Sequence, residues 1–108
     1  MKYLVSISAL LLLSGCSDTG AVTNAVKAGL KDPDSAEFGA IDVREGPGGK
    51  WACVTVNARN SFGGYTGDQQ VKLTYVEGEG WQWVGEPAEI SHESCMEYAD
   101  TKARGPIE

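Results

Sequence analysis

The chain has 108 residues, which is enough for one domain of ordinary size and no more. Its 15 acidic and 9 basic residues give a formal net charge of −6 at pH 7. This acidic balance argues against binding to the phosphate backbone of a nucleic acid, and against a basic patch on an anionic lipid surface.

The first fifteen residues have the composition of a targeting segment. Lys2 precedes an apolar run from Leu4 to Leu13, interrupted only by Ser6 and Ser8. A helix of that length reaches about 15 Å, half of a hydrocarbon core of roughly 30 Å. We therefore expect residues 1–15 to be a cleaved signal peptide rather than a membrane span. Without Lys2, the remainder carries 8 basic and 15 acidic residues, a net charge of −7.

The apolar run ends in Leu13-Ser14-Gly15-Cys16, which resembles the lipobox of bacterial lipoproteins. The resemblance implies that Cys16 is lipidated with fatty acyl chains such as palmitate, becomes the first residue, and anchors the chain to a membrane. Several chains suit a stable anchor, because each buried methylene contributes only about 0.8 kcal/mol. In that family Ser17 favours the periplasmic face of the outer membrane over the inner membrane. The alternative is an ordinary secretory leader followed by an unmodified cysteine.

The part after the anchor begins with a short polar segment, 16–20, expected to be a lipidated tether. The apolar spacing over 21–31 predicts a helix, with Asp18 or Thr19 as its cap. Asp32-Pro33 ends this helix, because the residue before a proline is pushed away from helical angles. Strands are predicted over 36–44, from Trp51 to about Arg59, over 69–76 and over 81–85, with a loop at 61–67 and a turn at 77–80.

The last elements complete a predicted α+β fold. A short helix is expected over 92–101, with a frayed tail at 105–108, since Gly105-Pro106 cannot continue a helix. Tight turns between consecutive strands predict a meandering antiparallel sheet of about four strands. The sequence thus predicts a single small domain over 21–104, with a helix at each end of the sheet.

The two cysteines left after Cys16 are Cys53 and Cys95. An even pair in a small exported domain predicts a disulfide. This bond would clip the C-terminal helix onto the central strand and close a loop of 41 intervening residues. The alternative is a reactive thiol at one of the two positions.

Two stretches resemble motifs of an uncharacterised group of small exported bacterial and phage-associated proteins. The first is LKDPDSAEF over residues 30–38, and the second is VNARNSFGGYTG over residues 56–67. The resemblance covers most of the domain but implies no activity, because none is known for the group.

The loop after the central strand is the candidate binding surface. Polar donors and aromatic rings on a glycine-bearing backbone suit a peptide, a glycan or a partner protein. The alternative is that the asparagines satisfy a sharp turn and the aromatic rings fill the core. The candidate residues are Asn57, Arg59, Asn60, Phe62 and Tyr65.

The tryptophans and the single histidine are further candidates for sites of chemistry. Trp51, Trp81 and Trp83 could form a platform for stacking sugars, but tryptophans in a small domain more often belong to the core. His92 is the single histidine, so no multi-histidine metal site is expected, and no metal or other cofactor is implied. A triad of His92 with Ser91 or Ser94 and a glutamate lacks the G-x-S-x-G motif, so no residue is assigned as catalytic.

The first functional hypothesis is a non-catalytic envelope lipoprotein whose binding surface meets another envelope protein or the cell wall. The alternatives are a small envelope hydrolase or cell-wall-acting enzyme, and a purely structural envelope lipoprotein. Exposed, pocketless Arg59 and Tyr65 would disfavour an enzyme, because an enzyme needs a cleft with converging titratable groups. Arg59 facing Glu37 or Glu86 inside a cleft would favour one.

Overall fold

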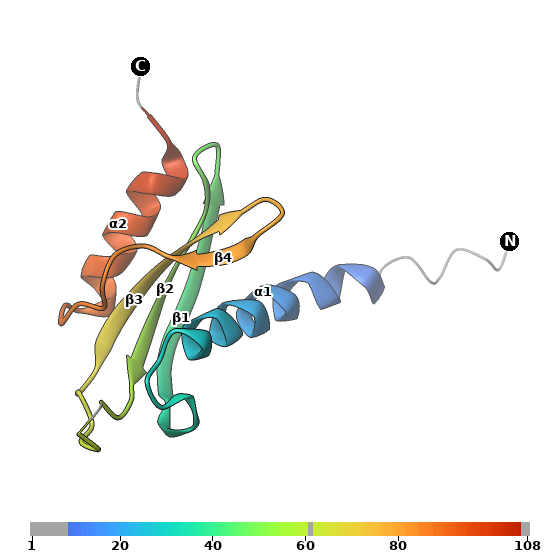
Figure 1. The fold of residues 1–108 in the computed structure, drawn as a ribbon. Helices are drawn as coiled ribbons and strands as arrows, with labels where there is room; N and C mark the ends of the chain where they lie inside the picture. The colour runs from blue at the N-terminus through green and yellow to red at the C-terminus, as the bar shows by residue number, and fades with distance from the viewer. Residues whose placement is uncertain (1–8, 61, 107–108) are drawn as a thin grey trace, which may run out of the picture.

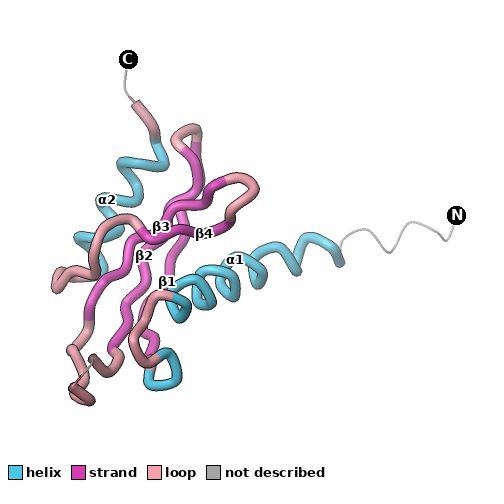
Figure 2. The backbone as a smooth tube through the Cα atoms, viewed as in Figure 1, coloured by secondary structure: helices cyan, strands magenta, loops and turns pink. Residues whose placement is uncertain are grey.

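The computed structural model describes residues 9–60 and 62–106, with side chains from Asp18 onward. The described chain is an α+β fold with a four-stranded antiparallel sheet in the order β1-β2-β3-β4 (Figure 1; Figure 2), as predicted. Its elements are α1 (Ala9–Ala28), a 3₁₀ turn (Pro33–Ser35), β1 (Glu37–Gly46), β2 (Gly49–Asn57), β3 (Gln69–Val76), β4 (Gly80–Trp83) and α2 (His92–Arg104).

The two helices cover opposite faces of the sheet (Figure 1). Successive side chains of a strand point to opposite faces, and both faces of β2 are apolar at its start, as its alternation predicted. On one face, Val22 and Val26 of α1 pack against the sheet. The buried residues of this first core are Val22, Val26, Ala52, Val54, Val56, Val71, Leu73 and Trp81. The smaller second core, under α2, consists of Cys53, Cys95, Met96 and Ala99, with Trp51 packed against it.

Helix α1 begins earlier than the sequence suggested. We expected a helix over 21–31 after a polar tether at 16–20, but the helix runs without a break from Ala9 to Ala28. No proline separates the apolar run from the later residues, and its leucines and alanines are strong helix formers. Asp18 and Thr19 therefore lie inside the helix rather than at its cap. Residues 1–8 of the expected signal peptide lie outside the described residues.

Helix α2 is capped at its start and held to the β1–β2 turn at its end. Ser91 caps its start, since the Ser91 hydroxyl accepts a hydrogen bond from the Ser94 backbone N–H at 3.0 Å. Near its end, the backbone N–H of Gly48 in the β1–β2 turn donates to the Ala103 carbonyl at 2.9 Å. The helix reaches Arg104 rather than the expected residue 101.

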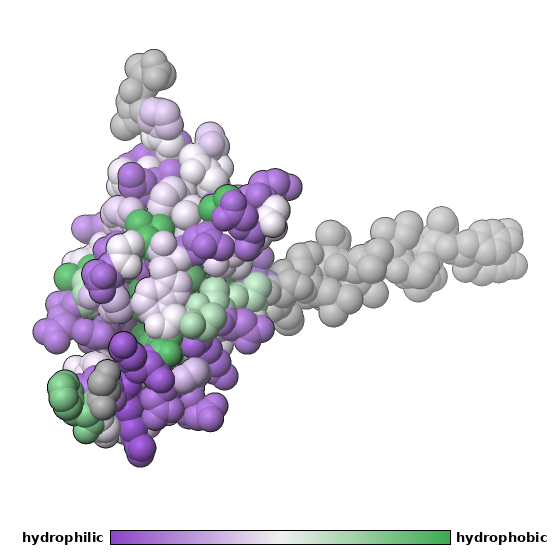
Figure 3. Space-filling view, viewed as in Figure 1, coloured by the Kyte–Doolittle hydropathy of each residue, from purple (hydrophilic) through white to green (hydrophobic). Residues whose placement is uncertain are grey.

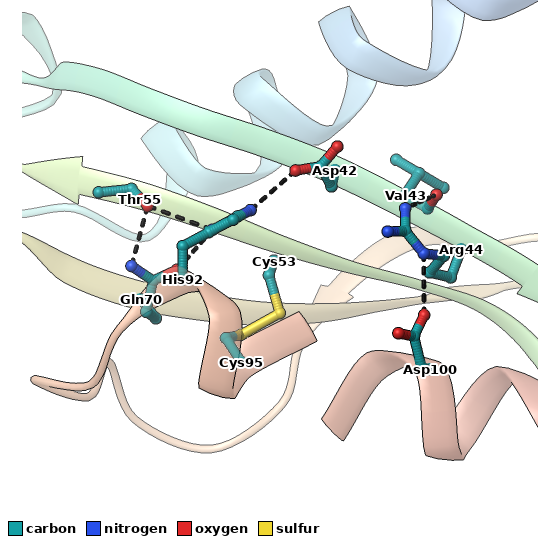
Figure 4. A network of polar contacts seen from close by, with 9 residues as sticks. All are labelled: Asp42, Val43, Arg44, Cys53, Thr55, Gln70, His92, Cys95 and Asp100. Atoms are coloured by element: carbon teal, nitrogen blue, oxygen red, sulfur yellow. Dashed lines mark hydrogen bonds and ion pairs between the residues drawn. A yellow bond between two sulfur atoms is a disulfide. The ribbon is translucent and has the colours of Figure 1, made fainter. Parts of the chain in front are cut away.

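The disulfide between Cys53 and Cys95 is present, as predicted, and both residues are fully buried. It joins the middle of β2 to the first turn of α2 (Figure 4). In the chain-entropy model, closing a loop of this size stabilises the fold by about 4 kcal/mol. This is a large share of the roughly 5–10 kcal/mol expected for a domain of this size.

Strand β4 is shorter than predicted, and the chain after it arches away from β3. Val84 still donates its backbone N–H to the Lys72 carbonyl at 2.8 Å. Gly85 then takes a positive φ of 71°, and the chain pairs again with β3 where Ala88 meets Gln70. The arch over residues 85–87 lies beside the end of α1 and helps to form the groove described below.

No helix in the described part of the chain combines the length and the apolar character needed to cross a bilayer.

Candidate functional site

The loop between β2 and β3 covers residues 58–68, of which Ser61 lies outside the described residues. Its base is closed by a backbone bridge between Arg59 and Tyr65, and by a hydrogen bond from the Thr66 N–H to the Ala58 carbonyl at 3.0 Å. The Arg59 guanidinium lies over the Tyr65 ring, 5.6 Å from its centroid. The loop is therefore an ordered hairpin-like extension of the sheet.

Both asparagines of the predicted binding surface serve the backbone of this loop. Asn60 Oδ1 accepts from the backbone N–H groups of Phe62 at 2.9 Å and Gly64 at 3.3 Å. Asn57 Oδ1 accepts from the Gly67 N–H at 3.0 Å. The alternative interpretation of the asparagines, that they satisfy a sharp turn, is therefore confirmed for both carbonyl oxygens.

The two aromatic residues of the loop are exposed to solvent and do not fill the core. Phe62 is 96% exposed and Tyr65 is 45% exposed. Figure 3 shows hydrophobic atoms at the outer end of this loop beside strongly hydrophilic surface. An exposed aromatic ring close to an arginine can supply contact area to a partner. Here the Asn60 hydrogen bonds fix the backbone that carries Phe62.

A groove of about 240 Å³ lies between this loop, the C-terminal end of α1 and the arch after β4. Its lining is apolar over much of its surface and charged or amide-bearing over the rest. The lining residues are Gly29, Leu30, Lys31, Val56, Ala58, Arg59, Asn60, Thr66, Gln69, Trp83, Glu86 and Pro87.

The groove joins the two sequence motifs on which the resemblance was based. Leu30 and Lys31 come from the first motif, while Ala58 and Arg59 come from the second. The motifs also touch directly, because the Arg59 backbone N–H donates to the Ser35 hydroxyl at 2.9 Å. The sequence placed Arg59 at the end of the central strand and left a cleft with Glu37 or Glu86 open as an alternative. It gave no sign that the residues after α1 would form a further side of that cleft.

Arg59 and Glu86 both line the groove, whereas Glu37 does not. Arg59 makes no ion pair with a described carboxylate within the 4.0 Å that defines one. The sequence predicted either exposed Arg59 and Tyr65 without a pocket, or Arg59 inside a cleft with a glutamate. The structure lies between the two, since both residues are exposed but Arg59 lines the groove.

The three tryptophans do not form a common platform. Trp81 and Trp83 share the α1 face, as their spacing predicted, and pack against the larger core. Trp51 lies on the other face and packs against the disulfide and α2. The core interpretation fits all three rings, and a joint stacking surface is impossible.

A polar network that the sequence did not reveal lies under the start of α2 (Figure 4). His92 Nε2 lies 2.9 Å from Asp42 Oδ2, and His92 Nδ1 lies 2.9 Å from Gln70 Oε1 and 3.2 Å from Thr55 Oγ1. Gln70 is 2% exposed and donates its amide N–H to Thr55 Oγ1 at 2.8 Å. The side chains of Thr55 in β2 and His92 in α2 thus satisfy the buried Gln70 amide.

The triad of His92 with Ser91 or Ser94 and a glutamate, to which the sequence assigned no catalytic role, does not form. Ser91 caps the helix by accepting from the Ser94 backbone N–H, and the Ser91 hydroxyl donates to the Ser94 hydroxyl at 3.1 Å. The histidine is held by Asp42 instead, 50 residues away in sequence, on the sheet face opposite the groove. Among the described residues, no cluster of three or more histidine, cysteine or acidic side chains could hold a metal ion.

Cys16 lies within the backbone of α1, and its side chain lies outside the described residues. Comparison with protein-family models, curated proteins and solved structures finds no match to this chain. The groove and its loop are therefore interpreted from their own chemistry.

Proposed function

We propose that this chain is an envelope lipoprotein that is anchored through Cys16 and uses the 58–68 loop and the adjoining groove to bind another envelope component without catalysis. The observation that carries the proposal is a loop that holds Phe62 almost fully exposed and whose base, at Arg59, Asn60 and Thr66, lines an apolar groove. Exposed aromatic and arginine side chains on a fixed backbone are typical of the residues that dominate binding energy at interfaces.

The position of the groove relative to Cys16 supports this proposal. The C-terminal end of α1 lines the groove at Gly29, thirteen residues after Cys16. At 1.5 Å per helical residue, the two positions are separated by about 20 Å along the helix axis. Figure 1 shows α1 leaving the sheet on the side away from the 58–68 loop. Anchoring at Cys16 would therefore hold the loop and the groove off the bilayer.

The separation of titratable groups argues for binding over hydrolysis. The groove offers Lys31, Arg59 and Glu86, while His92 with its carboxylate partner lies on the opposite face of the sheet. A substrate in the groove could not reach the imidazole. General acid–base catalysis requires hydrogen-bond reach to the reacting atoms.

Site-specific photocrosslinking in the native envelope tests the binding surface. A photoreactive phenylalanine analogue replaces Phe62 in one strain and the exposed Glu97 of α2 in a matched control. We expect a discrete adduct from position 62 that is absent from position 97 and lost when Arg59→Ala is added. Identical adducts from both positions would overturn the proposal for this loop.

Membrane fractionation tests the anchor separately. The Cys16→Ser variant should lose incorporation of radiolabelled palmitate and leave the membrane fraction, while the wild-type chain retains both. A variant that still takes up palmitate would rule out Cys16 as the lipidated residue.

A further inference from the structure

The charge of the groove differs from that of the chain. The chain without its expected leader carries −7, yet the groove contains Lys31 and Arg59 against Glu86 alone, a local balance of +1. The ion pairs among the described side chains are Arg44–Asp100, Lys50–Asp18 and His92–Asp42, so neither cation of the groove has a carboxylate partner there.

Arg59 is positioned before any ligand arrives. Its backbone N–H bonds to Ser35, its backbone bridges to Tyr65, and its guanidinium rests on the Tyr65 ring. A planar guanidinium offers paired donors that match a carboxylate, and fixing it beforehand reduces the entropy lost on binding. The single unit of excess positive charge matches a monovalent carboxylate better than a phosphate dianion.

The floor of the groove is apolar and fixed. Leu30, Val56, Ala58 and Pro87 contribute aliphatic surface, and Trp83 contributes its ring. The Trp83 indole cannot swing away easily, because its Nε1–H donates to the Ala25 carbonyl at 2.9 Å. Such a lining accepts an apolar side chain, while Asn60 and Gln69, which also line the groove, carry amides that suit a peptide backbone.

The size of the groove limits the occupant. Sites for drug-sized ligands enclose roughly 300–1,000 Å³, and this groove encloses about 240 Å³. It therefore suits one or two residues of a polypeptide rather than a whole cofactor. A chain end provides both required features, a free carboxylate and an adjacent apolar side chain.

We propose that the groove binds the carboxyl terminus of a partner polypeptide that ends in an apolar residue, with its terminal carboxylate paired to Arg59 and Lys31 and its last side chain on the floor beside Trp83. This rests on the proposed function and names the ligand class for the same site.

The test compares a peptide that has a charged terminal carboxylate with the same peptide in which that carboxylate is replaced by a neutral amide. The full acylated chain in lipid nanodiscs is titrated into a fluorescein-labelled pentapeptide ending in leucine, either as the free acid or as the carboxyl-terminal amide, and anisotropy is measured. We expect the free acid to bind about tenfold more tightly, as lost charged hydrogen bonds predict. Arg59→Gln and Lys31→Gln should each reduce this preference strongly.

Lys27→Gln is the matched control, because Lys27 is an exposed cation of α1 that does not line the groove. It should leave both affinities unchanged. Equal binding of acid and amide, no binding of either at millimolar concentration, or an equal loss in the Lys27→Gln variant would overturn the ligand assignment. Thermal melts of each variant confirm folding, which is expected because these cations are exposed.

The outcomes separate this inference from the proposed function. A position-62 crosslink that persists while acid and amide bind equally would overturn the carboxylate assignment and keep the binding surface. A clear preference for the acid without any position-specific crosslink would keep the ligand class and overturn the role of the loop in the envelope.

Discussion

The indole Nε1–H of Trp83 donates to the main-chain carbonyl of Ala25 at 2.9 Å, joining the last residue of β4 to the final turn of α1. The same ring lies against Gly29, where a Cβ atom would fall 2.6 Å from Trp83 Cζ2. The Trp83 ring thus contacts the end of α1, and this contact places the residues that follow α1 at the groove.

Replacing Gly29 by alanine should therefore destabilise the domain. The added methyl group would press against the indole ring, and overpacking of this kind costs typically about 1–3 kcal/mol. Gly20→Ala is the control, because Gly20 lies inside α1, the helix that ends just before Gly29, with nothing within 4 Å of an added Cβ. That change should stabilise the domain by about 0.5–1 kcal/mol. Urea unfolding of both variants checks the opposite signs, and shifts in the same direction would contradict this packing.

Removing the disulfide should have a larger effect. The double variant Cys53→Ala/Cys95→Ala loses the constraint on a loop with a sequence separation of 42, which predicts a loss of about 4 kcal/mol. The unfolding midpoint in urea measures it, with the oxidised wild-type chain as reference. A midpoint unchanged within error would show that α2 is held by packing alone.

The contact between the β1–β2 turn and the end of α2 predicts a second sensitive glycine. A Cβ at Gly48 would overlap the Lys102 carbonyl oxygen and lie 2.9 Å from Gly105 Cα. Because these are main-chain atoms that cannot rotate away, Gly48→Ala should cost about 1–3 kcal/mol.

Hydrogen exchange at the last turn of α2 checks this prediction, since local opening there should speed up. Gly64→Ala is the control, because Gly64 has open space around an added Cβ and a surface change of this kind should stay within about 0.5 kcal/mol. Equal exchange rates in the two variants would argue against the contact.

The network around His92 should behave as a coupled unit. His92→Ala removes the partner that lies 2.9 Å from the side-chain oxygen Gln70 Oε1, in a residue that is 2% exposed. An unsatisfied buried oxygen of this kind predicts a loss of about 1–3 kcal/mol in the free energy of unfolding. A double-mutant cycle with Gln70→Ala should give a coupling energy above about 0.5 kcal/mol. Glu93→Ala, at the exposed neighbouring position, serves as the control. Strictly additive effects would show that the two side chains act independently.

Local patterns were sufficient to predict most of the sheet. The alternation of Val71 and Leu73 with polar neighbours predicted β3 at its observed bounds, and the alternation from Trp51 predicted both faces of β2. The cysteine count predicted the disulfide. These features depend on periodicity and pairing within short stretches, which a sequence displays directly.

The features that were missed all depend on contacts between distant segments. Asp42 and His92 are 50 residues apart, and neither is marked by a motif. The groove requires Lys31, Arg59 and Glu86 to be brought together by the sheet. Phe62 was predicted as a binding residue, but its exposure could not be predicted. A phenylalanine beside glycines can either face solvent or fold back to fill the core.

The predicted start of α1 was wrong for a different reason. The prediction divided the chain at Cys16 according to the lipobox resemblance, whereas helix propensity alone favours an unbroken helix across that point. The lipobox resemblance concerns how the chain is processed, whereas helix propensity concerns its conformation. The observed helix bears only on the conformation.

The covalent cross-link lies entirely on the α2 side of the sheet, while α1 is held by packing, by the Asp18–Lys50 pair at 3.1 Å and by the Trp83–Ala25 hydrogen bond. Mechanical tension applied at position 16 would enter through α1, the helix that the Cys53–Cys95 disulfide does not hold. Under a steady pull, α1 would peel from the sheet first, while the segment between Cys53 and Cys95 could not lengthen. Because residues 29–31 line the groove, any separation of α1 from the sheet would also open the groove along that wall.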